Sequence, residues 1–203
     1  APRRGNGSGA DWSNAASLSS ALDGMTPALA ACSELWLLQG TYLPSGGTRS
    51  ATFLIARPLQ LYGGFAGIEP TRDGRTLNSS LTILSGDIGI AGSAADNAYH
   101  VLTLHGASNP LLASNTVIDN LTIADGNADG NSFDESDRGG GVNCRYNCSA
   151  TFNNVTFRNN AARRGGAMFH GSVSAAYTSR PVVRNSTFHD NRADYGAAVL
   201  SHA

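Results

Sequence analysis

The chain of 203 residues contains no lysine, and only 14% of its residues are charged. All 14 basic residues are arginines and the formal net charge is −1, so the chain lacks the concentrated basic surface that nucleic-acid phosphates require. No apolar run reaches the roughly 18 to 20 residues that a membrane-spanning helix needs. We therefore expect neither a nucleic-acid partner nor a membrane span in this chain.

Cysteine is scarce as well, and the motifs of several enzyme classes are missing. Cys144 and Cys148 stand in C-R-Y-N-C, which offers too few ligands for a closed four-ligand zinc site. The pair favours a short disulfide, typical of an oxidising compartment, over two unpaired loop thiols. Cys32 has no histidine near it in sequence, so we expect a small buried residue and not a nucleophile. No phosphate-binding loop, paired-histidine zinc motif or G-x-S-x-G elbow occurs.

Glycine is abundant at 24 residues, and a repeat fills the second half of the chain. Asn154–Asn160 returns 31 residues later as Asn185–Asn191, and a weaker copy begins at Asn120. Each unit contains two short alternating strands, N-x-T-F and G-G-A-M-F, with no helical stripe. A two-strand unit cannot bury its own apolar face, so three copies predict a stacked solenoid.

Stacking of like units predicts the direction of several side chains. We expect Val155 with Phe157, and Ala167 with Phe169, to face inward. Asn160 and Asn191 would occupy matching corners, where asparagine tolerates left-handed backbone and can bond its amide along the stack. These asparagines therefore indicate structure before ligand binding.

The first half of the chain also contains short predicted strands, but at less regular intervals. Short predicted strands recur every 20 to 24 residues, about the length of one solenoid coil. The stretch from Ser13 to Leu22 is the one helical candidate, with Ser13 as its cap and Ala15, Leu18 and Leu22 on one face. Such a helix would cover the end of the solenoid. The predicted strands are Leu35–Leu38, Leu59–Tyr62, Leu81–Leu84 and His100–Leu104.

Six segments of the chain carry a further resemblance: Gly9–Ala15, Glu34–Tyr42, Leu61–Gly67, Leu84–Asp87, Phe157-x-x-Asn160 and Gly165–Ala167. These segments are similar to secreted bacterial right-handed parallel β-helix proteins and to the repeats of polymorphic outer-membrane adhesins. The resemblance spans nearly the whole chain and implies a secreted or surface-exposed β-helix, a class in which most members have no assigned reaction. The chain departs from the pattern at Ile123–Gly126 and at Gly196–Ala198, where we expect local irregularity.

The sharpest chemical motif is the run Asp125–Gly130. Oxygen ligands at alternate positions, followed by glycine, match the first half of a calcium loop. The acid expected at position twelve is replaced by Ser136, although acids flank it on both sides. The alternative is a solvated acidic insertion between strands that runs to Asp137. The candidate calcium ligands are Asp125, Asn127, Asp129 and Glu135, and no other cofactor is predicted.

Polysaccharide lyases and hydrolases use the same fold, so an enzyme remains an alternative. A hydrolase needs two carboxylates roughly 5 to 10 Å apart. Asp87 and Asp119 are the acids nearest to predicted strands in the middle of the chain, yet turn or corner roles explain both. Arg163–Arg164 is interpreted as a solvated turn and not as an anion clamp. The aromatic residues that could stack on sugars are Tyr42, Tyr62, Phe65, Tyr146, Tyr177 and Tyr195.

The ends and the glycosylation motifs complete the sequence picture. The chain starts Ala1-Pro2-Arg3-Arg4, which favours a mature or trimmed product. It stops at Ala197–Ala203, inside a predicted strand without a closing cap, so we expect either a longer parent chain or a neighbouring subunit stacked head to tail in a filament. Six N-x-[ST] sequons are candidate glycosylation sites and begin at Asn6, Asn78, Asn120, Asn147, Asn154 and Asn185.

Taken together, these patterns predict an all-β chain: a right-handed parallel β-helix with a short N-terminal capping helix. We expect one domain over residues 1–203, with the cap in 1–30, irregular coils in 31–119 and repeat coils in 120–203. The predicted function is a non-catalytic structural or adhesin-like module, extracellular or on the cell surface. Its expected partners are neighbouring subunits, further domains of the same chain and cell-surface glycans. A polysaccharide-active enzyme and a carbohydrate-binding module are the alternatives.

Overall fold

A computed structural model describes residues 6–24, 30–106, 115–171 and 179–202. Short strands dominate it, accompanied by one short helix, α1 (Leu18–Leu22), and by 3-10 turns at Trp12–Asn14, Arg72–Gly74, Ser79–Leu81 and Ala94–Asp96. The strands are β1 (Glu34–Leu38), β2 (Gly40–Tyr42), β3 (Phe53–Ile55), β4 (Gln60–Phe65), β5 (Thr82–Ser85), β6 (Leu102–His105), β7 (Val117–Asp119), β8 (Thr122–Ala124), β9 (Asn127–Ala128), β10 (Val142–Arg145), β11 (Thr151–Asn153), β12 (Thr156–Arg158), β13 (Ala161–Arg164), β14 (Met168–Gly171), β15 (Val182–Arg184), β16 (Thr187–His189), β17 (Arg192–Tyr195) and β18 (Val199–His202).

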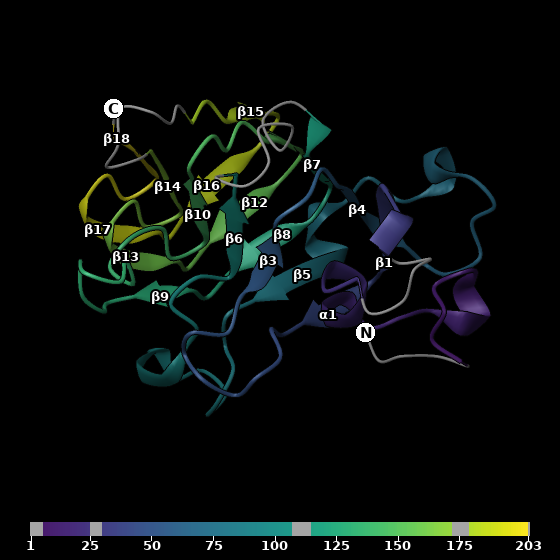
Figure 1. Ribbon diagram of the computed structural model, residues 1–203, viewed down its shortest axis with the longest axis horizontal. Coiled ribbons are helices and arrows are strands. Elements are labelled where there is room, and N and C mark those ends of the chain that lie inside the picture. The colour runs from purple at the N-terminus through teal and green to yellow at the C-terminus, as the bar shows by residue number, and fades with distance from the viewer. Residues whose placement is uncertain (1–5, 25–29, 107–114, 172–178, 203) are drawn as a thin grey trace.

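The strands form four sheets whose pairs are all parallel among the described residues. The first sheet has the order β1-β4-β7-β11-β15, the second β2-β5-β8-β12-β16, the third β3-β6-β10-β14-β18 and the fourth β9-β13-β17. The chain visits them cyclically in the rounds β1–β3, β4–β6, β7–β10, β11–β14 and β15–β18. Figure 1 shows these rounds following one another from the blue N-terminal strands to the yellow C-terminal ones. The expectation of an all-β chain with parallel sheets is confirmed.

The 31-residue repeat aligns side chains in register. Phe157 pairs with Ile123 on one side and with Phe188 on the other. The two phenylalanine rings stack with centroids 4.6 Å apart and planes 6° from parallel. Phe157 is fully buried in the hydrophobic core together with Val155, as predicted. Repeating units therefore place like residues directly above one another, which is the basis of this core.

A buried amide ladder runs beside the phenylalanine row. Asn160 Oδ1 accepts from Gly126 N at 3.1 Å, and its Nδ2 donates to Ile123 O at 3.0 Å and to Asn191 Oδ1 at 3.0 Å. Asn191 Nδ2 in turn donates to Phe157 O at 2.9 Å. The corner asparagines thus bond along the stack, as the sequence predicts. Because burial removes water, these amides are the partners that the corner backbone groups require.

The left-handed backbone lies next to these ladder residues and not on them. Asn159 and Asp190 have φ of 54° and 55°, and they immediately precede Asn160 and Asn191. A second left-handed row begins each repeat, at Asn120, Asn154 and Asn185, with φ between 49° and 58°. The expectation of left-handed backbone at Asn160 and Asn191 is therefore wrong by one residue. Each corner uses one residue for the bend and the next for the amide bonds.

Phe169, predicted to face inward, is one of the buried hydrophobic residues but is not part of the main core cluster. It pairs with Asn143 and, through the same register, with Thr103 and the exposed Leu54. Met168 occupies the inward position instead, in the core cluster with Ala167. Phe169 is nevertheless buried, because the Arg138 guanidinium covers its ring at 5.4 Å. The path of the chain through the Gly165–Gly166 turn decides which alternate side chains of β14 face inward, and the sequence does not specify that path.

The first half differs from its predicted spacing. β1 and β4 are neighbours in one sheet, with Glu34 paired to Gln60, whereas β5 and β6 belong to two other sheets. The recurrence of 20 to 24 residues therefore does not mark one round. The sequence did not predict β2 and β3 as strands, because three residues are too few to show an alternating pattern.

The helical segment before β1 is shorter than expected. Asp11 caps a 3-10 turn by accepting from Asn14 N at 2.9 Å, and α1 begins later, with Ser17 accepting from Ser20 N at 3.2 Å. Ser13 is therefore not the cap. Leu18 and Ala21 are the buried residues of α1. Residues 9–22, here called the N-terminal segment, pack on the first two rounds through Trp12, whose ring centroid lies 6.0 Å from that of Trp36 in β1 and 5.3 Å from that of Phe65 in β4.

We predict that Asn160→Ala lowers the free energy of unfolding by about 3 kcal/mol, because it leaves the buried Gly126 N–H and Ile123 C=O without their amide partner. The matched Asn191→Ala, at the half-buried end of the same ladder, should cost about 1 kcal/mol. Urea denaturation followed by circular dichroism measures both. Equal losses in the two variants would contradict the burial-dependent ladder.

Candidate functional site

A groove of about 440 Å³ crosses the outer face of the third sheet. The strand alternation that turns Leu102 and Leu104 into the core turns Thr103 and His105 outward into this groove. Leu54 of β3 stands beside them and is 46% exposed. We call this feature the outer groove. Its other lining residues are Ser50, Thr52, Ala56, Tyr99, His100, Asp134, Ser136 and Arg145.

One wall of the groove comes from the insertion between β9 and β10, residues 129–141. The Asp137 carboxylate is fully buried and forms ion pairs with Arg138 at 3.3 Å and with Arg164 at 3.1 Å. Glu135 pairs with Arg138 at 3.2 Å and also with Arg145 of β10. The insertion is thus fixed to the sheet by charges, and the prediction of a solvated loop up to Asp137 is wrong for its C-terminal part. Arg164, expected in a solvated turn, is one of its anchors.

His100 lies where the insertion meets the sheet. Its Nδ1 is 3.1 Å from Gly139 O and its Nε2 is 3.4 Å from Asn143 Nδ2. This geometry fits a neutral ring that donates from Nδ1 and accepts at Nε2. Burial, with Arg145 nearby, lowers the pKa of His100 to about 4. The imidazole is therefore uncharged at neutral pH and serves to join the insertion to β10.

The remaining groove residues offer hydroxyl groups and rings. Thr52 Oγ1 and Thr103 Oγ1 are 3.0 Å apart. Ser136 Oγ donates to Asp134 Oδ1 at 2.6 Å, which holds the pKa of the Asp134 carboxyl below its usual value. Burial lowers the pKa of His105 and Arg145 lowers it further. The groove thus combines hydroxyl groups and rings with the Asp134 carboxylate, the Arg145 guanidinium and an exposed apolar side chain.

The residues predicted to bind calcium do not come together. Asp129 pairs with Arg49 at 2.6 Å, Asp125 with Arg158 at 3.7 Å, and Glu135 with Arg138 and Arg145. Asn127 Nδ2 donates to Ala94 O at 2.8 Å and to Asp129 Oδ2 at 3.1 Å. Within residues 6–24, 30–106, 115–171 and 179–202, no three acidic, histidine or cysteine side chains form a group that could hold a metal. Arginine partners replace the cation that the motif suggested.

The two acids considered for hydrolysis are both engaged in structural contacts. Asp119 lies at the end of β7 and pairs with Arg75 at 3.3 Å, and Asn153 Nδ2 donates to the same carboxylate oxygen. Asp87 accepts from Gly92 N at 2.9 Å and closes a turn. The corner and turn roles proposed for them agree with these positions.

The structure contains the predicted disulfide, and Cys32 differs in part from its predicted burial. Cys144 and Cys148 form a disulfide, with Cα atoms 5.4 Å apart, at the turn from β10 toward β11. Cys32 forms no disulfide and is partly buried, so the prediction of a buried residue holds only in part. Its Sγ donates to Glu34 O at 2.8 Å.

The six sequon asparagines have different environments. Asn120 is fully buried, and its Nδ2 donates to Gly63 O at 3.0 Å and to Thr76 O at 2.7 Å. A glycan cannot occupy that nitrogen in the folded chain, so the glycosylation prediction fails at Asn120. Asn6, Asn78 and Asn185 are exposed, whereas Asn147 and Asn154 are partly buried.

Three of the six aromatic residues proposed as sugar platforms are buried. Phe65, Tyr42 and Tyr62 are buried, Tyr146 is partly exposed and Tyr195 is exposed. Tyr177 lies outside the described residues. The sequence did not identify Tyr99, whose ring lies 4.3 Å below the Arg49 guanidinium and borders the outer groove. The alternation in Leu102–His105 was the available signal for this face, since it sets Thr103 and His105 on the side opposite the core.

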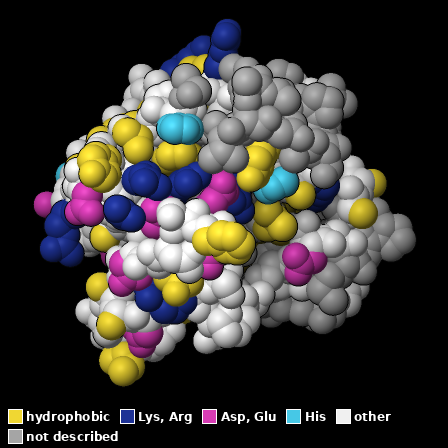
Figure 2. Space-filling model, turned by 60° about the vertical axis from the view of Figure 1, so that its left-hand side comes forward, with side chains coloured by type: hydrophobic (Ala, Val, Ile, Leu, Met, Phe, Trp, Pro, Cys, Tyr) yellow, Lys and Arg dark blue, Asp and Glu magenta, His cyan; other side chains and the backbone are white. Residues whose placement is uncertain are grey.

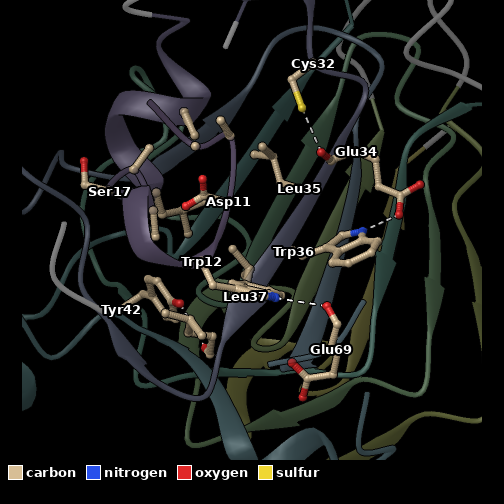
Figure 3. Close-up of a pocket in the computed structure, with 17 residues that line it drawn as sticks. Asp11, Trp12, Ser17, Cys32, Glu34, Leu35, Trp36, Leu37, Tyr42 and Glu69 are labelled. Atoms are coloured by element: carbon tan, nitrogen blue, oxygen red, sulfur yellow. Dashed lines mark hydrogen bonds between the residues drawn. The ribbon is translucent and has the colours of Figure 1, made fainter. Parts of the chain in front are cut away.

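A second hollow of about 400 Å³ lies between the N-terminal segment and β1. Figure 3 shows Trp12 and Trp36 next to each other in this N-terminal cavity, with Trp12 Nε1 donating to Glu69 O at 3.1 Å and Trp36 Nε1 donating to the Glu34 carboxylate. The backbone N–H groups of Ala66, Gly67 and Ile68 donate hydrogen bonds to the Glu69 carboxylate. The polar groups here hold the segment in place, so the outer groove is the better candidate site.

Figure 2 turns the side that carries β9, β13 and β17 forward and shows Arg, acidic and hydrophobic side chains intermixed among the described residues. In the part of the chain that the structure describes, no helix is long and apolar enough to cross a membrane. Comparison of the chain with protein-family models, with curated proteins and with solved structures gives no match.

The lowered pKa of His100 predicts a loss of stability in mild acid. The unfolded chain takes up this proton near pH 6.5 and the folded chain only near pH 4, so the folded state is favoured above pH 6.5 and loses up to about 1.4 kcal/mol per pH unit in between. The pKa values of His105 and His170 are also lowered, so these residues contribute to the loss of stability of the wild type as the pH falls. The difference between wild type and His100→Gln isolates His100.

Denaturant unfolding at pH 7.5, 6, 5 and 4.5 measures this dependence. We expect the free energy of unfolding to decline less steeply with falling pH in His100→Gln than in the wild type. Parallel curves for the two proteins would show that His100 is not the neutral group described above.

The buried ion pairs of the insertion give a further prediction. Asp137→Asn removes the charge shared by Arg138 and Arg164 and should lower the free energy of unfolding by about 3 kcal/mol. Asp73→Asn, in an exposed turn, is the control and should change it by less than about 0.5 kcal/mol. Thermal and urea unfolding at pH 7 test the pair, and similar stability of both variants would rule out the anchor.

Proposed function

We propose that this chain is a right-handed parallel β-helix that serves as a non-catalytic structural or adhesin-like module outside the cell. The observation that carries the proposal is the register of like side chains from round to round, seen in the Ile123–Phe157–Phe188 row. Parallel strands joined by crossover connections are right-handed in nearly all proteins, which supports the hand. A stack of this kind is a rigid support with variable outer turns.

Two further features support this assignment. The Cys144–Cys148 disulfide is typical of oxidising surroundings, which favours a secreted or surface location. The acids near the middle strands are engaged by arginines and backbone N–H groups, as Asp119 is by Arg75 and Asp87 by Gly92. Hydrolysis of a glycosidic bond needs a carboxylate pair in defined positions, so these contacts favour display over catalysis.

The outer groove is the surface that we assign to a partner, and cell-surface glycans are the ligand class that it suits. Sugar rings present hydroxyl groups around their edges and C–H groups on their faces. The groove supplies a hydroxyl from the partly buried Thr52 and an apolar contact from the exposed Leu54. The Tyr99 and His105 rings lie at its walls. Neutral sugars fit best, since Arg145 is already paired with Glu135.

Binding to a panel of neutral and acidic polysaccharides tests this function. We expect affinity for at least one neutral glycan, and Leu54→Ala should weaken it about fivefold by removing apolar contact in the groove. Leu43→Ala is a matched control, because Leu43 is also a half-exposed leucine (49% against 46% for Leu54) and lies outside the groove lining. Titration calorimetry measures the affinities.

The same samples distinguish the alternatives. New reducing ends or unsaturated products after incubation, with or without calcium, would overturn the non-catalytic assignment in favour of a polysaccharide-active enzyme. Equal weakening by Leu54→Ala and Leu43→Ala would move binding away from the outer groove. Absence of binding across the panel would reject the glycan partner and leave the structural role to be judged from the fold.

A further inference from the structure

Phe133 differs from every other phenylalanine of this chain in its exposure. Its side chain is fully exposed, whereas the other six phenylalanines are buried or half-buried. It lies in the insertion of residues 129–141, all of which the structure describes, and is the only large hydrophobic residue exposed there. Burial of such a ring would favour folding, so the folded state gains nothing from keeping it in water. We therefore considered what the ring could bind.

The turn that carries Phe133 is held in one conformation by its own side chains. Asn131 Oδ1 accepts from Phe133 N at 2.9 Å and from Asp134 N at 3.2 Å. Ser136 Oγ donates to Asp134 Oδ1 at 2.6 Å and accepts from Asn131 N at 2.9 Å. The ion pairs of the buried Asp137 fix the base of the turn. A ring presented by a preformed turn loses little further freedom when it binds a ligand.

This turn places the ring at the rim of the outer groove. Asp134 and Ser136, which follow Phe133 in the chain, both line the groove. Adjacent Cα atoms are about 3.8 Å apart, so the Phe133 backbone lies within one residue of the groove wall. The ring itself points into solvent and does not fill the groove. A ligand that occupies the groove and extends past Asp134 would therefore meet the ring.

The surroundings of the ring favour a sugar over a protein surface. Asn131, Ser132 and Asp134 are exposed and polar, so Phe133 is not part of a contiguous apolar patch. A stable protein interface buries about 1,200 to 2,000 Å² around an apolar centre, which this turn does not offer. A pyranose needs less, because its C–H groups pack on the negative face of one aromatic ring while its hydroxyls bond polar side chains beside it. Phe133 with Ser132 and Asp134 provides both kinds of contact.

We propose that Phe133 forms a second sugar-binding subsite beside the outer groove, and that the ligand is a neutral oligosaccharide long enough to reach both. One sugar unit contacts Leu54 in the groove, and a later unit of the same chain stacks on Phe133. The second contact is then intramolecular, so the two together bind more tightly than either alone. This inference rests on the glycan binding proposed above and deepens it, since it names the length of the ligand and the ring that selects for length.

Titration calorimetry with β-1,4-linked oligomers of glucose, mannose and xylose, each as a dimer and as a hexamer, tests the subsite. We expect the wild type to bind the hexamer of at least one series about tenfold more tightly than its dimer. Phe133→Ala should bring the Kd of the hexamer close to that of the dimer and leave the Kd of the dimer unchanged. Phe133→Tyr keeps the aromatic face and should keep the preference for length, whereas Phe133→Leu should lose it.

Ile68→Ala is the control, because Ile68 is also an exposed apolar residue (85%) and lies outside the groove lining, so both Kd values should stay unchanged. Urea unfolding of every variant should match the wild type, since neither side chain is buried. Hexamer binding that Leu54→Ala weakens but Phe133→Ala does not would overturn the subsite and leave the outer groove in place. Failure of the wild type to bind any of the oligomers would reject the glycan partner together with the subsite.

Discussion

Stacking like rounds on one another requires that every buried polar group at a corner find its partner in the neighbouring round. Strands satisfy their own backbone through parallel ladders, but the bends between them cannot. Asn160 meets this need by accepting from Gly126, by donating to Ile123 O and by bonding Asn191. The phenylalanine row, the glycine turns and the spacing of rounds all depend on corners that can be buried in this way.

The fold of the second half of the chain could be predicted well because the constant offset of the repeat defines the register of its strands. Phe157 above Phe188 and Asn160 above Asn191 follow directly from the offset of 31 residues. The first half has no such offset, and alternation over three residues in β2 or β3 cannot identify a strand or its sheet. The inward-facing residue near Phe169 could not be predicted from the sequence either. After a glycine turn, only the three-dimensional path of the chain decides which of two neighbouring apolar residues faces inward.

The candidate site was harder to predict because its contacts join residues far apart in the chain. Asp137 depends on Arg164, and Asp129 on Arg49, pairs that no local motif reveals. The run Asp125–Gly130 imitated a calcium loop because the same oxygen-rich residues that bind a cation also receive guanidinium groups. Cys144 and Cys148 were recognised since their spacing is local. Prediction succeeded where the relevant partner was near in sequence or repeated at a fixed interval.

The insertion of residues 129–141 leaves the ladder on either side of it intact: β10 pairs in full register with β6 before it and β14 after it. The exposed stretch Asn131–Asp134 is thus decoupled from the inner rows, whereas Glu135, Asp137 and Arg138 anchor the insertion. A foreign peptide grafted between Asp129 and Glu135 would be presented on a support that does not have to refold around it. The exposed part of the insertion can therefore vary in sequence without changes to the paired strands beneath it.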